Sequence, residues 1–228
     1  MNVYIWNDTW LPNKNTIAYY PLTSTSTVND LSWNNRNLTN SWVTFQTYSW
    51  VNCAYLNGTS AQLSYSNFYN IAQWDYTINV WARRLHTWLS AWNDWYVMCI
   101  GSTSSYYKWQ TSLIEFDDTR LRFAFWYDDL DSSINPEDTR TNICCQFKKT
   151  TNQQFIYVNW SFNNSRTATN THILQVLNLV IWNRYNTDPN YNNHFKWYLS
   201  NLIFENKQWT ADQVAWYYNQ TKSLYWIS

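Results

Sequence analysis

The chain has 228 residues and carries 15 basic against 15 acidic residues, so its charge gives no reason to expect nucleic acid or an anionic membrane surface as a partner. No apolar run is long enough to cross a bilayer, and membrane insertion is therefore not expected. The first ten residues lack both a basic start and an apolar h-region, so no signal peptide is expected there.

Short stretches rich in β-branched and aromatic residues alternate with clusters of Asn, Ser, Thr and Asp along the whole chain. This pattern predicts a series of short strands, as in an all-β sandwich. In chain order, the expected strands are Thr16–Leu22, Trp42–Thr47, Val51–Leu56, Tyr76–Arg84, Tyr96–Gly101, Ser112–Phe116, Leu121–Trp126, Asn142–Lys148, Gln154–Val158, Ile173–Ile181 and Phe195–Glu205. Alternation is clearest in Tyr76–Arg84, where Tyr76, Ile78, Val80 and Ala82 share one face.

One short helix is expected near the C-terminus, over Thr210–Asn219. Thr210 is a good N-cap, and Gln213 at the third helical position completes a capping-box pattern. Val214, Tyr217 and Tyr218 then give the helix an apolar face. The sequence thus predicts an all-β fold class with a single short C-terminal helix.

The content of tryptophan and glycine does not fit an ordinary all-β chain. Average usage would give about 7% Gly, or roughly 16 residues, yet the chain has 2 Gly and 18 Trp. Tight turns need residues that tolerate positive φ, which glycine supplies and tryptophan does not. Trp33, Trp95 and Trp160 follow Ser, Asp and Asn, where a turn favours glycine.

We interpret most of these tryptophans as glycines of the native protein, encoded by a UGA codon that some bacteria read as Gly. Only Trp81, Trp209 and Trp216 have the context of native tryptophans. The fifteen others are Trp6, Trp10, Trp33, Trp42, Trp50, Trp74, Trp88, Trp92, Trp95, Trp109, Trp126, Trp160, Trp182, Trp197 and Trp226. Trp33, Trp95, Trp160 and Trp197 are expected at turns or strained backbone, whereas Trp81, Trp209 and Trp216 are expected to be packed. The alternative is a Trp-rich protein whose indoles stack on sugar rings.

Five segments resemble, in the right order, motifs of laminin-G-like domains in the concanavalin A-like lectin/glucanase superfamily. They are Ala18–Leu22 with Asn29–Asn35, Tyr55–Gly58, Thr77–Trp81, Tyr157–Trp160, and the stretch from Phe195 to Val214. The resemblance implies a two-sheet antiparallel jelly-roll sandwich over residues 15–228, with residues 1–14 as an N-terminal extension. It also implies an extracellular or cell-surface location and binding of glycans, proteins or other surfaces.

Laminin-G-like domains often hold a structural Ca²⁺, and the resemblance implies where it would bind. Asp30 stands at the family's loop carboxylate, with Asn35 as a further loop ligand. Asn201 stands where the family often has an acidic residue on its last strand. Ca²⁺ needs six to eight oxygen ligands, so one carboxylate predicts a weak site. Alternatively, Asp30 caps its turn through an Asx hydrogen bond.

A second acidic cluster, formed by Asp128, Asp129 and Asp131 after Tyr127, is a candidate ligand-binding rim or Ca²⁺ site. The alternative is a solvated loop that limits edge pairing. Catalysis is not expected, because glucanases of this fold use an E-x-D-x-x-E strand. Glu115 and Asp117 match its first two carboxylates, but Arg120 replaces the third, so the general acid is missing.

Four cysteines show neither a CxxC pair nor a zinc spacing, which favours free buried thiols, while a Cys53–Cys99 bridge remains open. Cys144 and Cys145 would point to opposite faces of a strand.

Taken together, these features predict a non-catalytic binding or adhesion domain that recognises carbohydrate, with a glycan or a surface protein as its partner. The first alternative is a structural module of a surface appendage or phage particle that contacts protein. The second alternative is a glycoside hydrolase.

Overall fold

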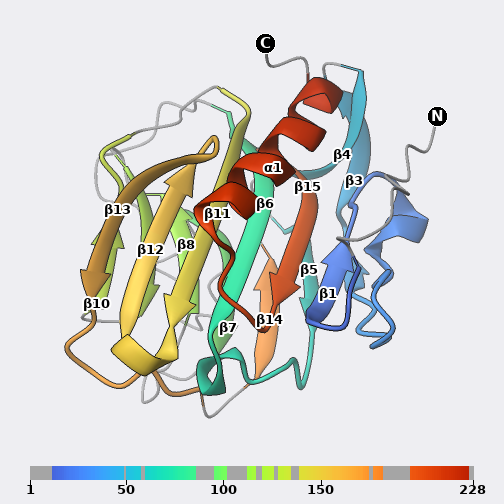
Figure 1. The fold of residues 1–228 in the computed structure, drawn as a ribbon. Coiled ribbons are helices and arrows are strands. Elements are labelled where there is room, and N and C mark those ends of the chain that lie inside the picture. The colour runs from blue at the N-terminus through green and yellow to red at the C-terminus, as the bar shows by residue number, and fades with distance from the viewer. Residues whose placement is uncertain are drawn as a thin grey trace.

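The computed structural model describes residues 12–48, 50–57, 60–85, 95–101, 112–116, 120–125, 128–134, 139–174, 177–181 and 196–225. Fifteen strands and one α-helix lie in these ranges (Figure 1). The strands are β1 (Thr16–Tyr20), β2 (Thr39–Ser41), β3 (Thr44–Tyr48), β4 (Val51–Asn57), β5 (Gln62–Tyr65), β6 (Tyr76–Arg84), β7 (Trp95–Gly101), β8 (Ser112–Phe116), β9 (Leu121–Phe125), β10 (Asp128–Asp131), β11 (Thr141–Lys148), β12 (Gln153–Val158), β13 (Ser161–Thr167), β14 (Asn178–Ile181) and β15 (Lys196–Glu205). The helix is α1 (Ala211–Thr221).

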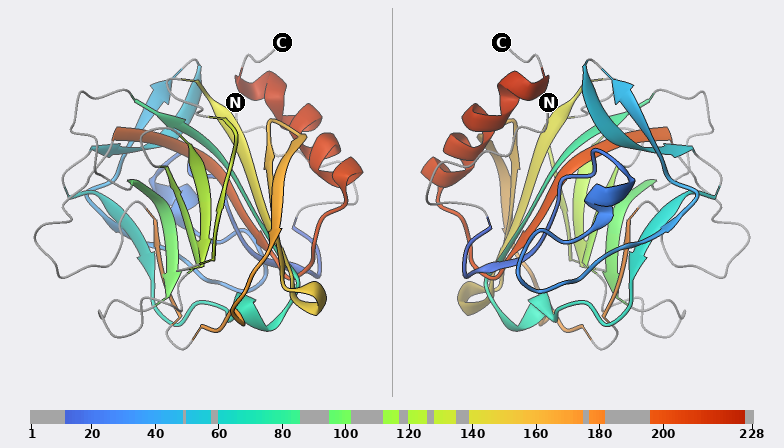
Figure 2. Two further views of the ribbon diagram at one scale, coloured as in Figure 1. Left: turned by 90° about the vertical axis from the view of Figure 1, so that its left-hand side faces the viewer. Right: turned by 90° about the vertical axis from the view of Figure 1, so that its right-hand side faces the viewer.

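Two antiparallel sheets make up the sandwich, as the sequence predicted. One has eight strands in the order β13-β12-β11-β6-β15-β4-β3, with β1 also pairing with β15. The other has seven strands in the order β10-β9-β8-β7-β14-β5-β2. Figure 2 shows the sheets face to face, with α1 on the outer face of the eight-stranded sheet. No helix in the described ranges is long and apolar enough to cross a membrane.

Alternate side chains of β6 pack on the two faces of the eight-stranded sheet. Tyr76, Ile78, Val80 and Ala82 all belong to the main core between the sheets, as predicted. Trp81 points to the other face and belongs to a second cluster beneath α1. Because a strand turns successive side chains to opposite faces, one strand serves both clusters.

The helix begins as its capping pattern predicted. The Thr210 hydroxyl accepts a hydrogen bond from the Gln213 amide, and the Gln213 side chain accepts one from the Thr210 amide. Val214, Tyr217 and Tyr218 are buried against the sheet. These contacts fix α1 on the outer face, where it covers part of β6, β11 and β15 (Figure 1).

Four strands were not predicted: β2, β5, β10 and β13. They are short or rich in Asn, Ser and Asp, and β2, β10 and β13 lie at sheet edges. The expectation of a solvated loop over the acidic cluster was therefore wrong, because Asp128–Asp131 pairs with β9. The strand expected to begin at Ile173 begins instead at Asn178.

All four cysteines are buried free thiols. The bridge left open between Cys53 and Cys99 does not form, since Cys53 lies on β4 and Cys99 on β7, in different sheets. Cys145 belongs to the main core and Cys144 to the cluster beneath α1, on opposite faces of β11 as expected.

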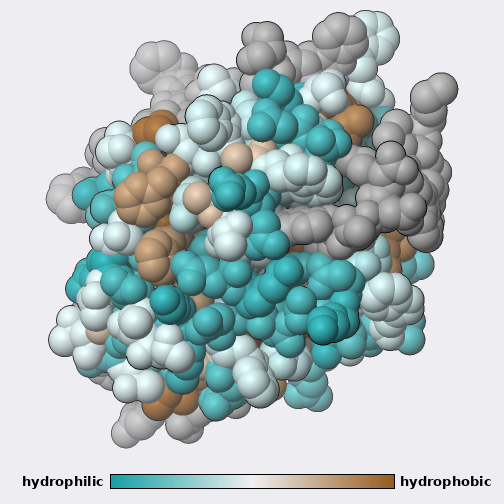
Figure 3. Space-filling view, viewed as in Figure 1, coloured by the Kyte–Doolittle hydropathy of each residue, from teal (hydrophilic) through white to brown (hydrophobic). Residues whose placement is uncertain are grey.

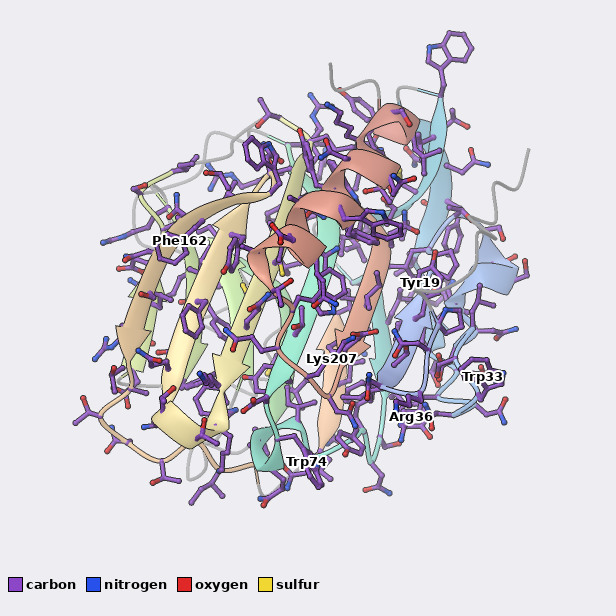
Figure 4. The ribbon with its side chains drawn as sticks, viewed as in Figure 1. Tyr19, Trp33, Arg36, Trp74, Phe162 and Lys207 are labelled. Carbon is purple, nitrogen blue, oxygen red and sulfur yellow. The ribbon has the colours of Figure 1, made fainter. Side chains whose placement is uncertain are left out.

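The described tryptophans fall into two main groups. Side chains of Trp33, Trp42, Trp50, Trp74 and Trp160 are 53–84% exposed, and Figure 4 shows Trp33 and Trp74 at separate places on the periphery. Trp81, Trp197 and Trp209 are at most 1% exposed. The expectation for Trp197 was wrong, because it lies within β15 and packs in the main core.

The remaining tryptophans give partial information. Trp216 was expected to be packed, but it is 40% exposed on α1. Trp95 begins β7. The others named above (Trp6, Trp10, Trp88, Trp92, Trp109, Trp126, Trp182 and Trp226) lie outside the described residues.

Candidate ligand-binding site

The Asp30 carboxylate organises the loop that follows β1. Its Oδ1 accepts hydrogen bonds from the amides of Tyr19 and Ser32, at 3.0 and 2.8 Å. Its Oδ2 accepts from the Ser32 hydroxyl at 2.7 Å and from the Arg36 amide at 3.0 Å. The Ser32 amide contact is the Asx hydrogen bond that the sequence offered as the alternative to metal binding.

These residues do not fit a Ca²⁺ site in the observed arrangement. Both Asp30 oxygens face N–H and O–H groups, whose hydrogens point to where a cation would sit. Asn35 is exposed with φ of 54°. Asn201 Oδ1 instead accepts from the Tyr19 hydroxyl, and its Nδ2 donates to the Tyr225 hydroxyl. No group of three His, Cys, Asp or Glu side chains suited to a metal occurs in the described part of the chain.

The second acidic cluster lies where the edges of the two sheets meet. Arg166 on β13 donates to the Asp129 carbonyl at 2.8 Å and forms an ion pair with Asp128 at 3.1 Å. Asn164 donates to the Asp131 carbonyl at 2.8 Å. The polar side chains of β13 thus join the edge strand of one sheet to the edge strand of the other.

Asp128 holds the loop after β13 as well. It is 1% exposed, and it accepts hydrogen bonds from the amides of Thr169 and Asn170 and from the Asn170 side chain, at 2.7–2.9 Å. Burial by itself raises the pKa of this carboxyl, but these hydrogen bonds outweigh burial and lower its pKa. Both oxygens are occupied within the fold. Tyr127, the fourth residue of the predicted ligand rim, lies outside the described residues.

Glu115 is likewise engaged inside the protein. It lies on β8, is 3% exposed, and forms an ion pair with Arg122 on the neighbouring strand β9 at 3.3 Å. Arg122 also holds Asp131 at 2.7 Å, and Arg120 holds the other Asp131 oxygen at 2.9 Å. Asp117 lies outside the described residues.

An unpredicted surface of three tyrosines lies on the outer face of the eight-stranded sheet, beside α1. Tyr55 on β4 stands opposite Tyr198 on β15, and their ring centroids are 5.2 Å apart. Tyr48 on β3 stacks on Tyr198 with centroids 4.9 Å apart and planes inclined by 21°. All three side chains are half-buried. We call Tyr48, Tyr55 and Tyr198 the tyrosine surface.

Two arginines and an amide border the tyrosine surface. The Arg83 guanidinium lies 4.1 Å from the centre of the Tyr48 ring, and that of Arg140 lies 5.3 Å from it. Both contacts are within cation–π range. The Tyr198 hydroxyl donates to Oε1 of exposed Gln46 at 3.4 Å. Burial, followed by the neighbouring Tyr55, raises the pKa of Tyr198, so this hydroxyl remains a donor at neutral pH.

Sequence patterns offered little signal for this surface, because its members come from β3, β4 and β15. Alternation in the sequence can show which residues of one strand point outward. It does not show which strands are neighbours, and the sheet order brings residues 48, 55 and 198 together.

Comparison with solved structures shows the same fold in the binding domains of botulinum neurotoxins and of Paraclostridial Mosquitocidal Protein 1. The binding domain of Paraclostridial Mosquitocidal Protein 1 has a TM-score of 0.72 and 14% identity, with 90% of this chain and 52% of that chain covered. The botulinum neurotoxin serotype G binding domain has a TM-score of 0.70 and 14% identity, covering 92% and 52%. The botulinum neurotoxin DC binding domain in complex with rat synaptotagmin II has a TM-score of 0.69 and 11% identity, covering 90% and 52%.

At these identities the likeness establishes the fold. The chain spans about half the length of these solved chains. No protein-family model and no curated protein sequence matches it. The laminin-G-like assignment therefore stays a prediction within the jelly-roll-like sandwich class.

Proposed function

We propose that this chain is a non-catalytic binding domain that acts outside the cell or at a cell surface and recognises carbohydrate. The observation that carries the proposal is the shared sandwich, over 90% or more of this chain, with the toxin binding domains described above. One of them is in complex with a protein, rat synaptotagmin II, so a surface protein is the second candidate partner.

The acidic side chains support a non-catalytic role. A retaining glycosidase needs two carboxyl groups about 5 Å apart, one of which can donate a proton. The position of the general acid is taken by Arg120, Glu115 and Asp131 are both held by Arg122, and Asp128 is held by Arg166. In the described residues these carboxylates serve the fold.

The exposed tryptophans would be obvious sugar-stacking residues if they were native. We propose that the native protein has glycine there, because three of them occupy backbone that favours glycine. Trp42, Trp50 and Trp160 have φ of 63°, 68° and 71°, in the left-handed region that costs a residue with a Cβ on the order of 1 kcal/mol. Asn159 and Trp160 form the two-residue connection between β12 and β13, where Asn-Gly is the favoured pair.

The coding DNA tests this proposal directly. We expect UGA codons at positions 42, 50 and 160, and UGG codons at positions 81 and 209. UGG codons at all three strained positions would show that the tryptophans are native and that a Trp-rich lectin is the better description.

Binding of the full chain to a glycan array and to cultured cells tests the proposed function. We expect saturable binding to a subset of glycans and loss of cell binding after the cells are treated with glycosidases. Binding that resists glycosidases but is lost after protease treatment would indicate a protein partner. A chain that binds neither array nor cells would overturn the proposal.

A further inference from the structure

We propose that the tyrosine surface is a carbohydrate-binding site, in which a pyranose ring packs on the solvent-exposed parts of the three tyrosine rings and its hydroxyls bond to the tyrosine hydroxyls, Arg83 and Gln46. This inference rests on the proposed function and adds the location and chemistry of the site.

The tyrosine surface and Arg83 form one continuous area because their strands are neighbours in the sheet. Register places Tyr55 beside Tyr198 and Tyr198 beside Arg83 across three adjacent strands, β4, β15 and β6. Their inward neighbours Ala54, Leu199 and Ala82 belong to the main core, so these side chains point to the outer face. The site is therefore built on a packed sheet, which holds it more precisely than a loop would.

Burial of these rings differs from that of core aromatics. Tyr48, Tyr55 and Tyr198 are half-buried and belong to neither hydrophobic cluster. By contrast, Tyr217 and Tyr218 on α1 are 5% exposed and pack in the second cluster. The tyrosine surface thus keeps ring area in contact with solvent while its rings are fixed by stacking on one another.

The chemical groups of the tyrosine surface complement those of a sugar. A pyranose presents apolar C–H groups on its ring faces and hydroxyls around its edge, and tyrosine combines an apolar ring with a polar hydroxyl. Tyrosine is used in binding surfaces because it offers a large rigid area at low conformational entropy. Arg83 and Gln46 add donors and an acceptor beside the rings, the groups that sugar hydroxyls bond to.

A second exposed aromatic side chain on the same sheet, Phe162, lacks these features. Phe162 on β13 is 55% exposed and packs edge-on against Tyr157, with ring centroids 5.6 Å apart. Figure 3 shows only a small apolar patch there, on a face that is otherwise largely hydrophilic. Phe162 therefore provides a matched control on the opposite edge of the same sheet.

Affinity for an array-identified glycan tests the site, with the double variant Tyr48→Ala/Tyr198→Ala compared with Phe162→Ala. We expect the double variant to bind roughly tenfold more weakly or worse, since two stacking rings are removed. Phe162→Ala should bind like the wild type. Circular dichroism and thermal melting establish whether each variant is folded.

Because the double variant removes mutually stacked rings, Arg83→Gln and Tyr198→Phe provide a milder test. Both keep a side chain of similar size, and we expect weaker binding with the melting temperature little changed. Full affinity in the folded double variant, or in both mild variants, would overturn the site while leaving the proposed function intact. A wild-type chain that binds no glycan would overturn both.

Discussion

The imidazole of His172 lies flat on the ring of Phe125, with ring centroids 3.8 Å apart and planes inclined by 3°. His172 is 2% exposed, in the connection between β13 and β14. Its Nε2 is 3.5 Å from the Tyr76 hydroxyl, and Phe147 contacts the ring edge-on. Burial, assisted by the positive charge of Lys149, lowers the pKa of His172 to about 3.

We expect His172 to make the protein less stable in mild acid. Its pKa is lowered on folding from about 6.5, so below pH 6.5 the unfolded chain binds a proton that the folded protein does not. Stability is then lost progressively as the pH falls from 6.5 toward 3, by up to about 1.4 kcal/mol per pH unit. Urea unfolding at a series of pH values measures this slope.

The variant His172→Phe is the control for that slope. It removes the titrating group from the aromatic contact, so the dependence between pH 6.5 and 4.5 should become shallower than in the wild type. An unchanged slope in the folded variant would assign the pH dependence to other groups.

Replacing Asp128 by Asn should destabilise the protein by about 2–4 kcal/mol. The change removes a buried charge that accepts bonds from Thr169, Asn170 and Arg166, and their donors would be left poorly satisfied. Asp129→Asn is the control, because the Asp129 side chain is 38% exposed and 4.0 Å from Arg122, and should cost less than about 1 kcal/mol. Equal losses would contradict this account of the edge contact. Loss of glycan binding without loss of stability would instead support a ligand role for Asp128.

Asn79→Leu should stabilise the protein by about 1–2 kcal/mol. Asn79 is fully buried beside α1, and among the described residues neither its side-chain oxygen nor its nitrogen has a hydrogen-bond partner, so an apolar group of similar size removes a desolvation cost. Thr77→Val, on the same face of β6, should instead destabilise the protein. The Thr77 hydroxyl donates to the Lys207 carbonyl and accepts from the Trp209 amide. Chemical denaturation measures the free energy of unfolding of both variants. A lower stability of Asn79→Leu would indicate that an ordered water satisfies the Asn79 amide.

Trp160→Gly and Trp81→Gly should shift stability in opposite directions. Glycine relieves the positive φ of Trp160, which is 53% exposed, and should add about 1 kcal/mol. Glycine at position 81 removes a fully buried indole whose Nε1 donates to the Thr221 hydroxyl at 3.0 Å, and should cost about 3–5 kcal/mol. Thermal melts made side by side compare the two. Similar losses in both variants would argue against glycine at position 160.

Any Ca²⁺ that binds is expected to involve Asp30 and to bind weakly, because it must displace four hydrogen-bond donors. Isothermal titration should then show weak Ca²⁺ binding that is lost in Asp30→Ala, or no detectable binding in either protein. Tight binding that persists in Asp30→Ala would place the metal elsewhere. Asp30→Ala should also lower the melting temperature with or without Ca²⁺, since the loop loses its central acceptor.

The sequence by itself determined those features that depend on neighbours along the chain. Alternation in β6 assigned its core face, and Thr210 with Gln213 marked the start of α1, because strand periodicity and capping act within a few residues. The Asx bond of Asp30 is equally local. The class of fold followed from many such strands in succession.

Tertiary structure alone decided the rest. β10 and β13 are polar enough to read as loops, and they are strands because each has a paired neighbour and because Arg166 and Asn164 join the two edges. Trp197 is buried because β15 is central in its sheet, a position that its local sequence does not encode. The tyrosine surface exists because sheet order places residues 48, 55 and 198 side by side, and such long-range pairing is set by burial of the whole core rather than by local preference.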